Sequence, residues 1–339
     1  MPYHNDRPRL SGRRIIAICI GAVLVYTGVV FGVQAIGNKI ETSGAVETVG
    51  SLDGRFTDTT LTMQYADRAW TYRKKDLTNI LLMGVDWEEL DESNTERYAG
   101  QADFLLLMTI DQKNKTVSTI QLDRDTMTDV RIYGPFGNYT GTQELQICLS
   151  HAYGDSDTTN CENTVWAVSN LLQNIPIDGY IALDMSAITI LNDTLGGVTV
   201  TLEDDLSSLD PAMTKGTTLT LQGKQAEYFA RSRMSIGDGT NSSRMRRQRE
   251  FIRSAEELLA EKINSDTSFV GTIFDALDGH MTTNVERGWL INKAYVCAEY
   301  ERTDTQTLVG THSIGEDGFM EFHVDTDALK DLVATNFFE

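Results

Sequence analysis

Short apolar runs alternate with longer amphipathic segments along most of this sequence. Residues 77–86, 103–111 and 115–123 are apolar runs of strand length, and a polar turn between the last two suits a hairpin. Residues 162–175 and 242–263 instead carry apolar residues at helical spacing. Further strands are expected at 179–184, 198–202 and 317–325, and further helices at 185–197, 221–233 and 326–338, with a short helix near 62–73. This alternation predicts an α/β fold, a layered α-β-α domain with a central mixed sheet.

The amino-terminal segment does not fit this pattern. Residues 15–36 form an uncharged run of 22 residues, which as a helix spans about 33 Å and is long enough to cross a bilayer core. Four arginines precede it, at positions 7, 9, 13 and 14, and positive flanks stay in the cytoplasm. A cleaved signal peptide is the alternative, although the apolar run exceeds a usual signal core of about 7–15 residues.

We therefore expect a single-pass protein of the cell membrane whose carboxyl-terminal part is extracellular. The predicted organisation is a cytoplasmic tail (1–14), a transmembrane helix (15–36), an extracellular stalk (37–76) and one folded domain (77–339). The formal net charge of −20 argues against nucleic acid as a general partner, because a polyphosphate would be repelled. Any anionic ligand must be held by a local basic site.

Two cysteines lie close together in the part of the chain expected to be external. Cys148 and Cys161 are 13 residues apart, and an oxidising extracellular environment permits disulfides. We expect a Cys148–Cys161 disulfide, with two separate buried thiols as the alternative. The cysteine and histidine spacings along the chain do not match a zinc site.

Arginines are concentrated in one segment of this acidic chain. Residues 230–250 contain six, at positions 231, 233, 244, 246, 247 and 249. If the segment is extended at Arg231 and Arg233, both side chains leave it on one face. Arg244, Arg247 and Gln248 share a face of the following helix, at spacing i, i+3, i+4. Guanidinium groups that converge beside a helix amino terminus suit a phosphate group.

The remaining two arginines fall off that shared face. Arg246 and Arg249 are expected to face water, paired with Glu250 or Glu257. For the cluster as a whole, the alternative to a phosphate site is a salt-bridged surface.

Carboxylates accompany these arginines. Asp103 opens the predicted strand 103–111, and Arg124 and Asp125 follow the strand at 115–123. Two aspartates beside phosphate-binding arginines suit a hard divalent ion that bridges phosphate oxygens. The combination predicts phosphoryl transfer on a pyrophosphate. Asp123 and Asp125 also match the D-x-D pattern of metal-dependent glycosyltransferases, which is an alternative chemistry.

Several sequence blocks occur here in the order found in one known family. They are NILLMGVD, ADFLLLMTID, LDRDT, HAYG, IPIDGYIALDM, LGGVTV, LQGKQAEYFARSR and RMRRQ, between residues 77 and 255. The chain resembles the LytR–CpsA–Psr enzymes of Gram-positive cell envelopes. The resemblance implies that residues 77–339 are the catalytic domain of a membrane-anchored extracellular phosphotransferase. Such an enzyme moves a glycopolymer, for example a teichoic acid or capsule, from an undecaprenyl-pyrophosphate carrier to peptidoglycan through a phosphodiester bond.

The resemblance also implies roles for individual residues. They are Arg124, Asp125 and Asp103 as catalytic residues, Arg231, Arg233, Arg244 and Gln248 as pyrophosphate ligands, and Asp103 and Asp125 as ligands of Mg²⁺ (or Mn²⁺). A non-catalytic binding or sensor module for lipid-linked glycans is the alternative, because a degenerate enzyme can keep its pocket. The chain departs from the family pattern at Ala102, Phe104, Asp123, Cys148 and Asn241, and these departures leave the arginines intact.

Overall fold

The structure is a computed structural model that describes residues 61–86, 100–134, 137–232, 236, 241–266, 268–297 and 300–339. The predicted cytoplasmic tail, the transmembrane helix and most of the stalk lie outside these residues, as does Arg233. No helix within the described ranges is long and apolar enough to span a membrane.

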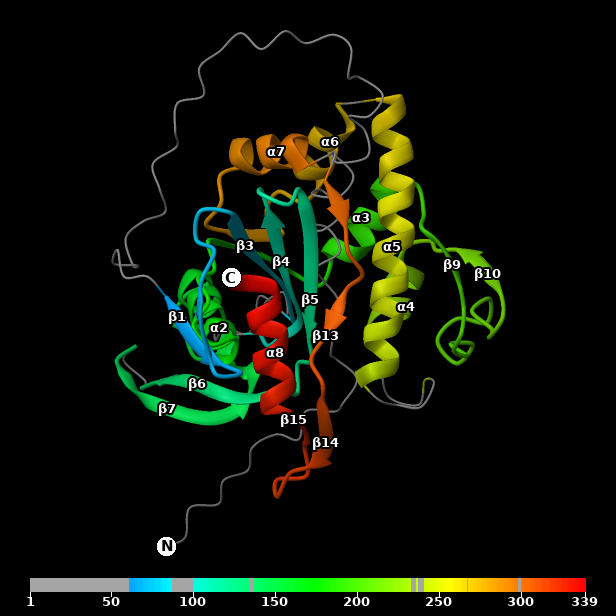
Figure 1. The fold of residues 1–339 in the computed structure, drawn as a ribbon. Helices are drawn as coiled ribbons and strands as arrows, with labels where there is room; N and C mark the ends of the chain where they lie inside the picture. Colours follow the sequence, from blue (N-terminus) through cyan, green and yellow to red (C-terminus); the bar gives the residue numbers. More distant parts are fainter. Residues whose placement is uncertain are drawn as a thin grey trace, which may run out of the picture.

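A mixed sheet forms the centre of the described domain (Figure 1). Its strands, in spatial order, are β11 (Met281–Thr283), β8 (Gly179–Leu183), β3 (Leu77–Val85), β4 (Ala102–Asp111), β5 (Thr116–Leu122) and β12 (Glu301–Arg302), and β13 (Gln306–Thr307) also pairs with β5. The pairing β4–β5 is antiparallel, as the hairpin prediction required, and β3–β4 is antiparallel as well, whereas β3–β8 and β5–β12 are parallel. The predicted central mixed sheet is confirmed.

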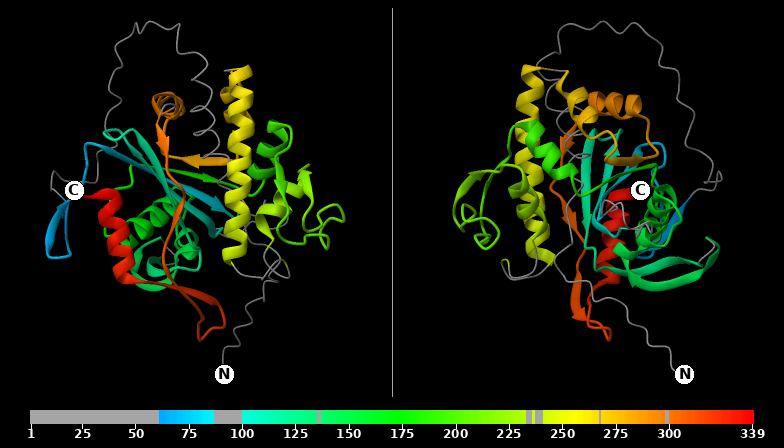
Figure 2. Two further views of the ribbon diagram at one scale, coloured as in Figure 1. Left: turned by 45° about the vertical axis from the view of Figure 1, so that its right-hand side comes forward. Right: turned by 180° about the vertical axis from the view of Figure 1, so that it is seen from behind.

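Helices cover both faces of this sheet. Figure 2 shows α2 (Asp157–Leu171) and α8 (Thr326–Phe337) on one face, and α3 (Ala187–Leu195), α4 (Lys224–Arg231) and α5 (Asn241–Ser265) on the other. Helices α6 (Phe269–Ala276) and α7 (Arg287–Val296) lie across one end (Figure 1). All nine residues of β3 and all ten of β4 are buried, which explains why both strands are almost continuously apolar.

Antiparallel hairpins lie outside the central sheet. They are β1 (Thr62–Tyr65) with β2 (Arg68–Thr71), β6 (Met127–Tyr133) with β7 (Tyr139–Gln146), β9 (Thr199–Thr201) with β10 (Thr218–Thr220), and β14 (Gly310–Ile314) with β15 (Met320–Val324). A 3₁₀ helix, η2 (Ile147–Ala152), follows β7. An isolated bridge between Thr126 and Phe322 holds the β14–β15 hairpin against the segment that leaves β5.

One element prediction is wrong near the start of the described chain. Residues 62–73, expected as a short helix in the stalk, form the β1–β2 hairpin and pack on the domain. Tyr72 is buried, and Asn79 Nδ2 donates a 2.9 Å hydrogen bond to its hydroxyl. The Tyr72 ring also meets Phe338 edge to face, at 5.8 Å between centroids. The folded domain therefore includes residues 61–76, because aromatic burial ties this hairpin to the core.

The boundaries of α2 also differ from the prediction. It begins at Asp157 rather than 162, because Ser156 and Thr159 form a capping box that satisfies the first backbone N–H groups. It ends at Leu171 rather than at the predicted residue 175. Helix α3 ends close to its predicted end. Gly196 closes it with φ of +88°, a backbone conformation that residues other than glycine rarely adopt.

Candidate active site

The antiparallel pairing of β4 with β5 brings the predicted acidic and basic residues together. Asp103 is the second residue of β4, and Arg124 and Asp125 follow β5 directly. Because Leu105 pairs with Leu122, the start of β4 lies beside the end of β5. An ion pair joins Arg124 Nη1 to Asp103 Oδ1, and Arg124 Nε lies 3.3 Å from Asp125 Oδ1.

All three charged residues are buried, so their charges act strongly on one another. Asp103, Arg124 and Asp125 are exposed by only 4%, 8% and 4%. Burial raises the pKa of the Asp103 carboxyl, while the positive charges of Arg124, Arg244 and Arg231 oppose that shift. Burial lowers the pKa of Arg124, but Asp103, Cys148 and Asp125 together raise it by more, so the guanidinium keeps its charge. Arg244 and Arg231 thus lie close enough to act on the Asp103 carboxylate.

Two further side chains fix the orientation of the Arg124 guanidinium. Its Nη2 donates to Gln101 Oε1 at 2.6 Å and lies 3.1 Å from Cys148 Sγ. Cys148 belongs to η2, and burial raises the pKa of its thiol to about 12. A neutral thiol and a neutral amide therefore complete the surroundings of Arg124 without adding charge.

The amino-terminal part of α5 turns the predicted residues inward. Arg244, Arg247 and Gln248 are each exposed by 3% or less, so the shared face that their spacing predicts is confirmed. Gln248 Oε1 accepts a 3.2 Å hydrogen bond from Gln121 Nε2 on β5. The helix face that carries Arg244 is thereby held against the end of β5 that carries Arg124.

Arg247 lies on the same face of α5 as Arg244, but its contacts are structural. Its Nε donates to the carbonyl oxygen of Phe229 at 2.9 Å, and its Nη1 pairs with Asp204. These contacts join α5 to the end of α4. Arg231, at that end of α4, pairs with Glu227 and exposes 17% of its side chain. Arg231 is thus positioned beside the cluster but remains more accessible than Arg244.

Asp123 links three parts of the structure around the candidate site. Its Oδ1 accepts hydrogen bonds from Asn241 Nδ2 and, at 2.9 Å, from the Asp125 backbone N–H. Its Oδ2 lies 3.0 Å from His312 Nε2 on β14. Because both oxygens have protein partners, Asp123 is poorly suited to hold a metal with Asp125. This geometry speaks against the D-x-D glycosyltransferase alternative.

The two outer arginines differ from one another. Arg246 is exposed and pairs with Glu203 at 2.7 Å and with Asp204 at 3.3 Å, rather than with the predicted glutamates. The expectation that Arg249 faces water is wrong: it is half-buried, and its Nη1 donates to Gln121 Oε1 at 2.7 Å. Gln121 lies at the end of β5 and draws this side chain toward the sheet.

The predicted disulfide is absent from the structure. Cys148 and Cys161 are both buried free cysteines with different neighbours. The Cys148 sulfur faces the Arg124 guanidinium, whereas the Cys161 sulfur lies 3.6 Å from His151 Nε2. The packing of η2 and α2 therefore directs the two sulfurs to separate partners, and the alternative of two buried thiols describes the structure.

Sequence reasoning missed three residues that shape the site. Gln101 and His312 contact Arg124 and Asp123 directly, and His151 Nδ1 bonds the carbonyl of Gly100 at 2.8 Å, one residue before Gln101. Of these three residues, only His151 lies in a sequence block that the family resemblance singles out, HAYG. Nothing in the local sequence near residue 312 indicates that a late hairpin reaches the end of β5.

The acidic residues fit a divalent cation only in part. No group of three or more metal-binding side chains is arranged around a common point in the described part of the chain. Asp103 and Asp125 nevertheless contact the same guanidinium, so their carboxylates lie close together. Mg²⁺ is commonly held by one or two carboxylates with substrate phosphates and water as its other ligands. The donor set therefore fits Mg²⁺ bound together with a phosphate substrate.

The fold and this cluster define a class of protein. It is an α/β domain in which the ends of two central strands carry a buried arginine between two carboxylates, beside an arginine-bearing helix. A site of this composition suits a pyrophosphate, because arginine grips phosphate oxygens in pairs. The sequence matches the LytR_cpsA_psr family over residues 39–337, and the chain belongs to that family.

Individual relatives agree with this assignment. A protein of Bacillus subtilis, the polyisoprenyl-teichoic acid–peptidoglycan teichoic acid transferase TagU, is 30% identical over 273 residues, covering 78% of this chain and 79% of that protein. The crystal structure of a Streptococcus agalactiae protein covers 77% of this chain and 88% of its own, with a TM-score of 0.62 and 23% identity. The structure of B. subtilis TagV covers 77% and 96%, with a TM-score of 0.58 and 24% identity. These two structures share the fold.

Proposed function

We propose that this protein is an extracellular phosphotransferase that moves a glycopolymer from an undecaprenyl-pyrophosphate carrier to peptidoglycan. The main observation behind the proposal is the buried Arg124, which is held between Asp103 and Asp125. The positive charge of Arg244 also acts on the Asp103 carboxylate. Family membership supports it, since a relative is named as a transferase of polyisoprenyl-linked teichoic acid to peptidoglycan. Teichoic acid or a related glycopolymer is therefore the proposed cargo.

The proposed reaction exchanges one phosphorus–oxygen bond for another. A sugar hydroxyl of peptidoglycan attacks the phosphorus that carries the glycan, and a new phosphodiester bond forms. The bond from that phosphorus to the bridging oxygen breaks, and the electron pair leaves with undecaprenyl phosphate. The proton of the hydroxyl passes to a carboxylate or to water. No nucleotide is consumed, because the pyrophosphate bond is already activated.

The arginines supply the main electrostatic contribution. Arg124, Arg231, Arg244 and, outside the described residues, Arg233 are proposed to bind the pyrophosphate, with Gln248 beside them. Their fixed positive charges stabilise the negative charge that develops on the leaving phosphate. Arg244 suits this role because it is almost fully buried, where a charge–charge interaction is less screened than at the surface.

The carboxylates have two proposed roles. Asp103 and Asp125 are the residues that would hold Mg²⁺ (or Mn²⁺), which when bound supplies further neutralisation of phosphate oxygens. Either carboxylate is also proposed to orient the attacking hydroxyl. Burial raises the pKa of Asp103, which favours a carboxyl able to accept a proton as the reaction proceeds.

The proposed location follows from the amino terminus. The uncharged run at 15–36, behind four arginines, is proposed as a membrane anchor that leaves the catalytic domain outside the cell. A lipid-linked donor is confined to the same membrane. Anchoring would therefore raise the rate of encounter between enzyme and donor by holding both at one surface.

A transfer assay tests the proposal. Full-length protein is incubated with Mg²⁺, peptidoglycan and an undecaprenyl-pyrophosphate glycan labelled in both the glycan and the lipid. We expect labelled glycan on peptidoglycan and an equal amount of released undecaprenyl phosphate. Donor binding without release of lipid would instead identify a non-catalytic module. A glycosidic rather than a phosphodiester linkage in the product would identify a glycosyltransferase.

A further inference from the structure

A second set of arginines projects from the opposite side of α5. Arg246, Arg249 and Arg253 follow one another at spacing i, i+3, i+7, so they share a face of the helix. This face is turned away from the buried Arg244 and Gln248. The side chains of Arg246 and Arg253 are exposed by 47% and 64%. None of these three arginines is assigned to the pyrophosphate.

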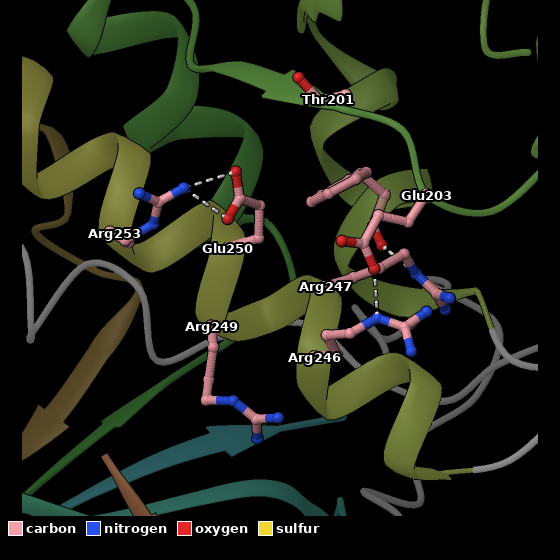
Figure 3. Close-up of a pocket in the computed structure, with 8 residues that line it drawn as sticks. Thr201, Glu203, Arg246, Arg247, Arg249, Glu250 and Arg253 are labelled. Carbon is pink, nitrogen blue, oxygen red and sulfur yellow. Dashed lines mark hydrogen bonds and ion pairs between the residues drawn. The ribbon is translucent and has the colours of Figure 1, made fainter. Parts of the chain in front are cut away.

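A pocket lies beside this face. It has a volume of about 200 Å³, room for several water molecules at roughly 30 Å³ each. Its lining residues are Thr201, Glu203, Phe229, Arg246, Arg247, Arg249, Glu250 and Arg253 (Figure 3). Four guanidinium groups thus face two carboxylates in the lining itself. Asp204, which pairs with Arg246 and Arg247, and Glu257, which lies 3.8 Å from Arg253, bring the carboxylates to four. This concentration of arginines stands out in a chain of net charge −20.

Arg249 differs from Arg246 and Arg253 because no ion pair with a carboxylate is seen for it among the described residues. Arg246 pairs with Glu203, and Arg253 pairs with Glu250 at 2.8 Å. Figure 3 shows Arg249 directed away from both glutamates. Among the described residues its hydrogen-bond partner is the neutral Gln121. Burial and the nearby charge of Arg246 both lower the pKa of Arg249, so an anion at this position would relieve an unfavourable environment.

Hydrogen bonds connect this pocket to the candidate active site. Gln121 accepts from Arg249 through Oε1 and donates to Gln248 through Nε2 at 3.2 Å. Gln121 therefore joins the outer arginine to a residue on the inner face of α5. Arg249 lies five residues beyond Arg244, which is about 7–8 Å along the helix axis. Because Arg249 lies on the opposite face of α5, a polyanion anchored at Arg244 must also pass around the helix, whose diameter with side chains is about 10–12 Å.

We propose that the pocket at Arg246, Arg249 and Arg253 binds a phosphodiester group of the polymer whose pyrophosphate end occupies the candidate active site. This inference rests on the proposed function and specifies its substrate as a polymer with phosphate in its repeating units. Guanidinium groups suit such an anion because they donate paired hydrogen bonds to phosphate oxygens. The pocket would select long anionic donors over short or uncharged ones.

A binding measurement tests the pocket independently of catalysis. Full-length protein is titrated with a lipid-free glycerol-phosphate polymer and with an uncharged glycan of equal length. We expect the wild type to bind the polymer and not the uncharged glycan. Arg249→Gln should weaken polymer binding about tenfold, as expected for the loss of one charge-assisted contact. Arg287→Gln is the control, since Arg287 is an exposed arginine paired with Asp275 on a different part of the surface. Equal affinity of Arg249→Gln and wild type for the polymer would overturn the proposal.

A transfer measurement separates this inference from the proposed function. Two donors are compared, one with a long phosphodiester-containing glycan and one with a short glycan that lacks phosphodiesters. Arg249→Gln should raise KM about tenfold for the long donor and leave kcat and the short donor unchanged. Equal increases in KM for both donors would place Arg249 at the pyrophosphate and refute the pocket. If the wild type transfers neither donor, the proposed function fails, while the binding titration still decides the pocket.

Discussion

Asp123 and Asn241 are 118 residues apart in the sequence, yet Asn241 Nδ2 donates a hydrogen bond to Asp123 Oδ1. Asp123 immediately precedes Arg124, and Asn241 is the first residue of α5, three positions before Arg244. The bond therefore fixes one predicted phosphate-binding arginine relative to the other. His312 holds the second oxygen of Asp123 at 3.0 Å, so the late β14–β15 hairpin belongs to the same support.

Replacing Asp123 should loosen this support. Asp123→Ala removes the acceptor for Asn241 and for the backbone N–H of Asp125, and each buried donor left without a partner costs about 1–3 kcal/mol. We expect a lower free energy of unfolding and a reduced transfer rate, measured by urea titration and the transfer assay. Asp129→Ala is the control, because Asp129 is exposed on β6. Wild-type values for Asp123→Ala would show that the hydrogen bonds are unimportant.

The inner and outer arginines of α5 should differ in function. Arg244→Ala removes a buried charge next to Asp103, and we expect transfer to fall by about ten- to a hundredfold, the effect of losing a charge-assisted contact of roughly 1.5–3 kcal/mol. Arg246→Ala removes an exposed ion pair and should change the short-donor rate little. The comparison is kcat/KM for the short donor. Similar losses in the two variants would refute the assignment of Arg244.

His151 predicts a specific pH dependence of stability. Burial lowers its pKa from 6.5 to about 4, so the unfolded chain takes up a proton between these values that the folded chain excludes. The stability that His151 contributes is complete above pH 6.5 and is lost as the pH falls through 4, by about 3 kcal/mol in all.

The matched variant is His151→Asn, which keeps a donor for the Gly100 carbonyl but does not titrate. Unfolding free energies of both proteins are measured by urea titration from pH 7.5 to pH 4. We expect the variant to gain stability relative to the wild type as the pH falls. A difference that is independent of pH would mean that His151 is not buried in its neutral form.

The cysteines should behave as protected thiols. Because burial raises the pKa of Cys148 to about 12, its reactive thiolate is scarce at pH 8. We expect slow alkylation by iodoacetamide in the native protein and rapid alkylation of both Cys148 and Cys161 in denaturant without reductant. Peptide mapping under non-reducing conditions is the readout. A peptide that contains both cysteines joined by a disulfide would contradict the structure.

The amino-terminal anchor gives a prediction that concerns residues outside the described structure. Full-length protein from its native host should stay with the membrane after washes in high salt and in carbonate, since residues 15–36 carry no charge. The amino terminus of the mature protein, determined by peptide sequencing, is the second readout. A mature chain that begins near Ile36 would identify a cleaved signal peptide instead.

Local sequence patterns were sufficient for the elements that the core buries most deeply. The apolar runs at β3 and β4 are buried on both faces, so almost every position carries the signal. The inward face of α5 was also predictable, because helical spacing alone places Arg244 and Gln248 together. Weak or exposed elements carry too little pattern to predict: the sequence of β1 and β2 favours a helix, and no local pattern indicates β14.

The sequence by itself determined the strongly patterned strands and helices and the types of residue gathered near the site, because those features depend on spacing within a single element. Only the tertiary structure decided which side chains meet. The partner of Arg124 on β4, the bonds from Asn241 and His312 to Asp123, and the separation of Cys148 from Cys161 all depend on how distant segments pack. A side-chain contact requires placement to within about 3 Å, and packing across the whole domain sets that placement.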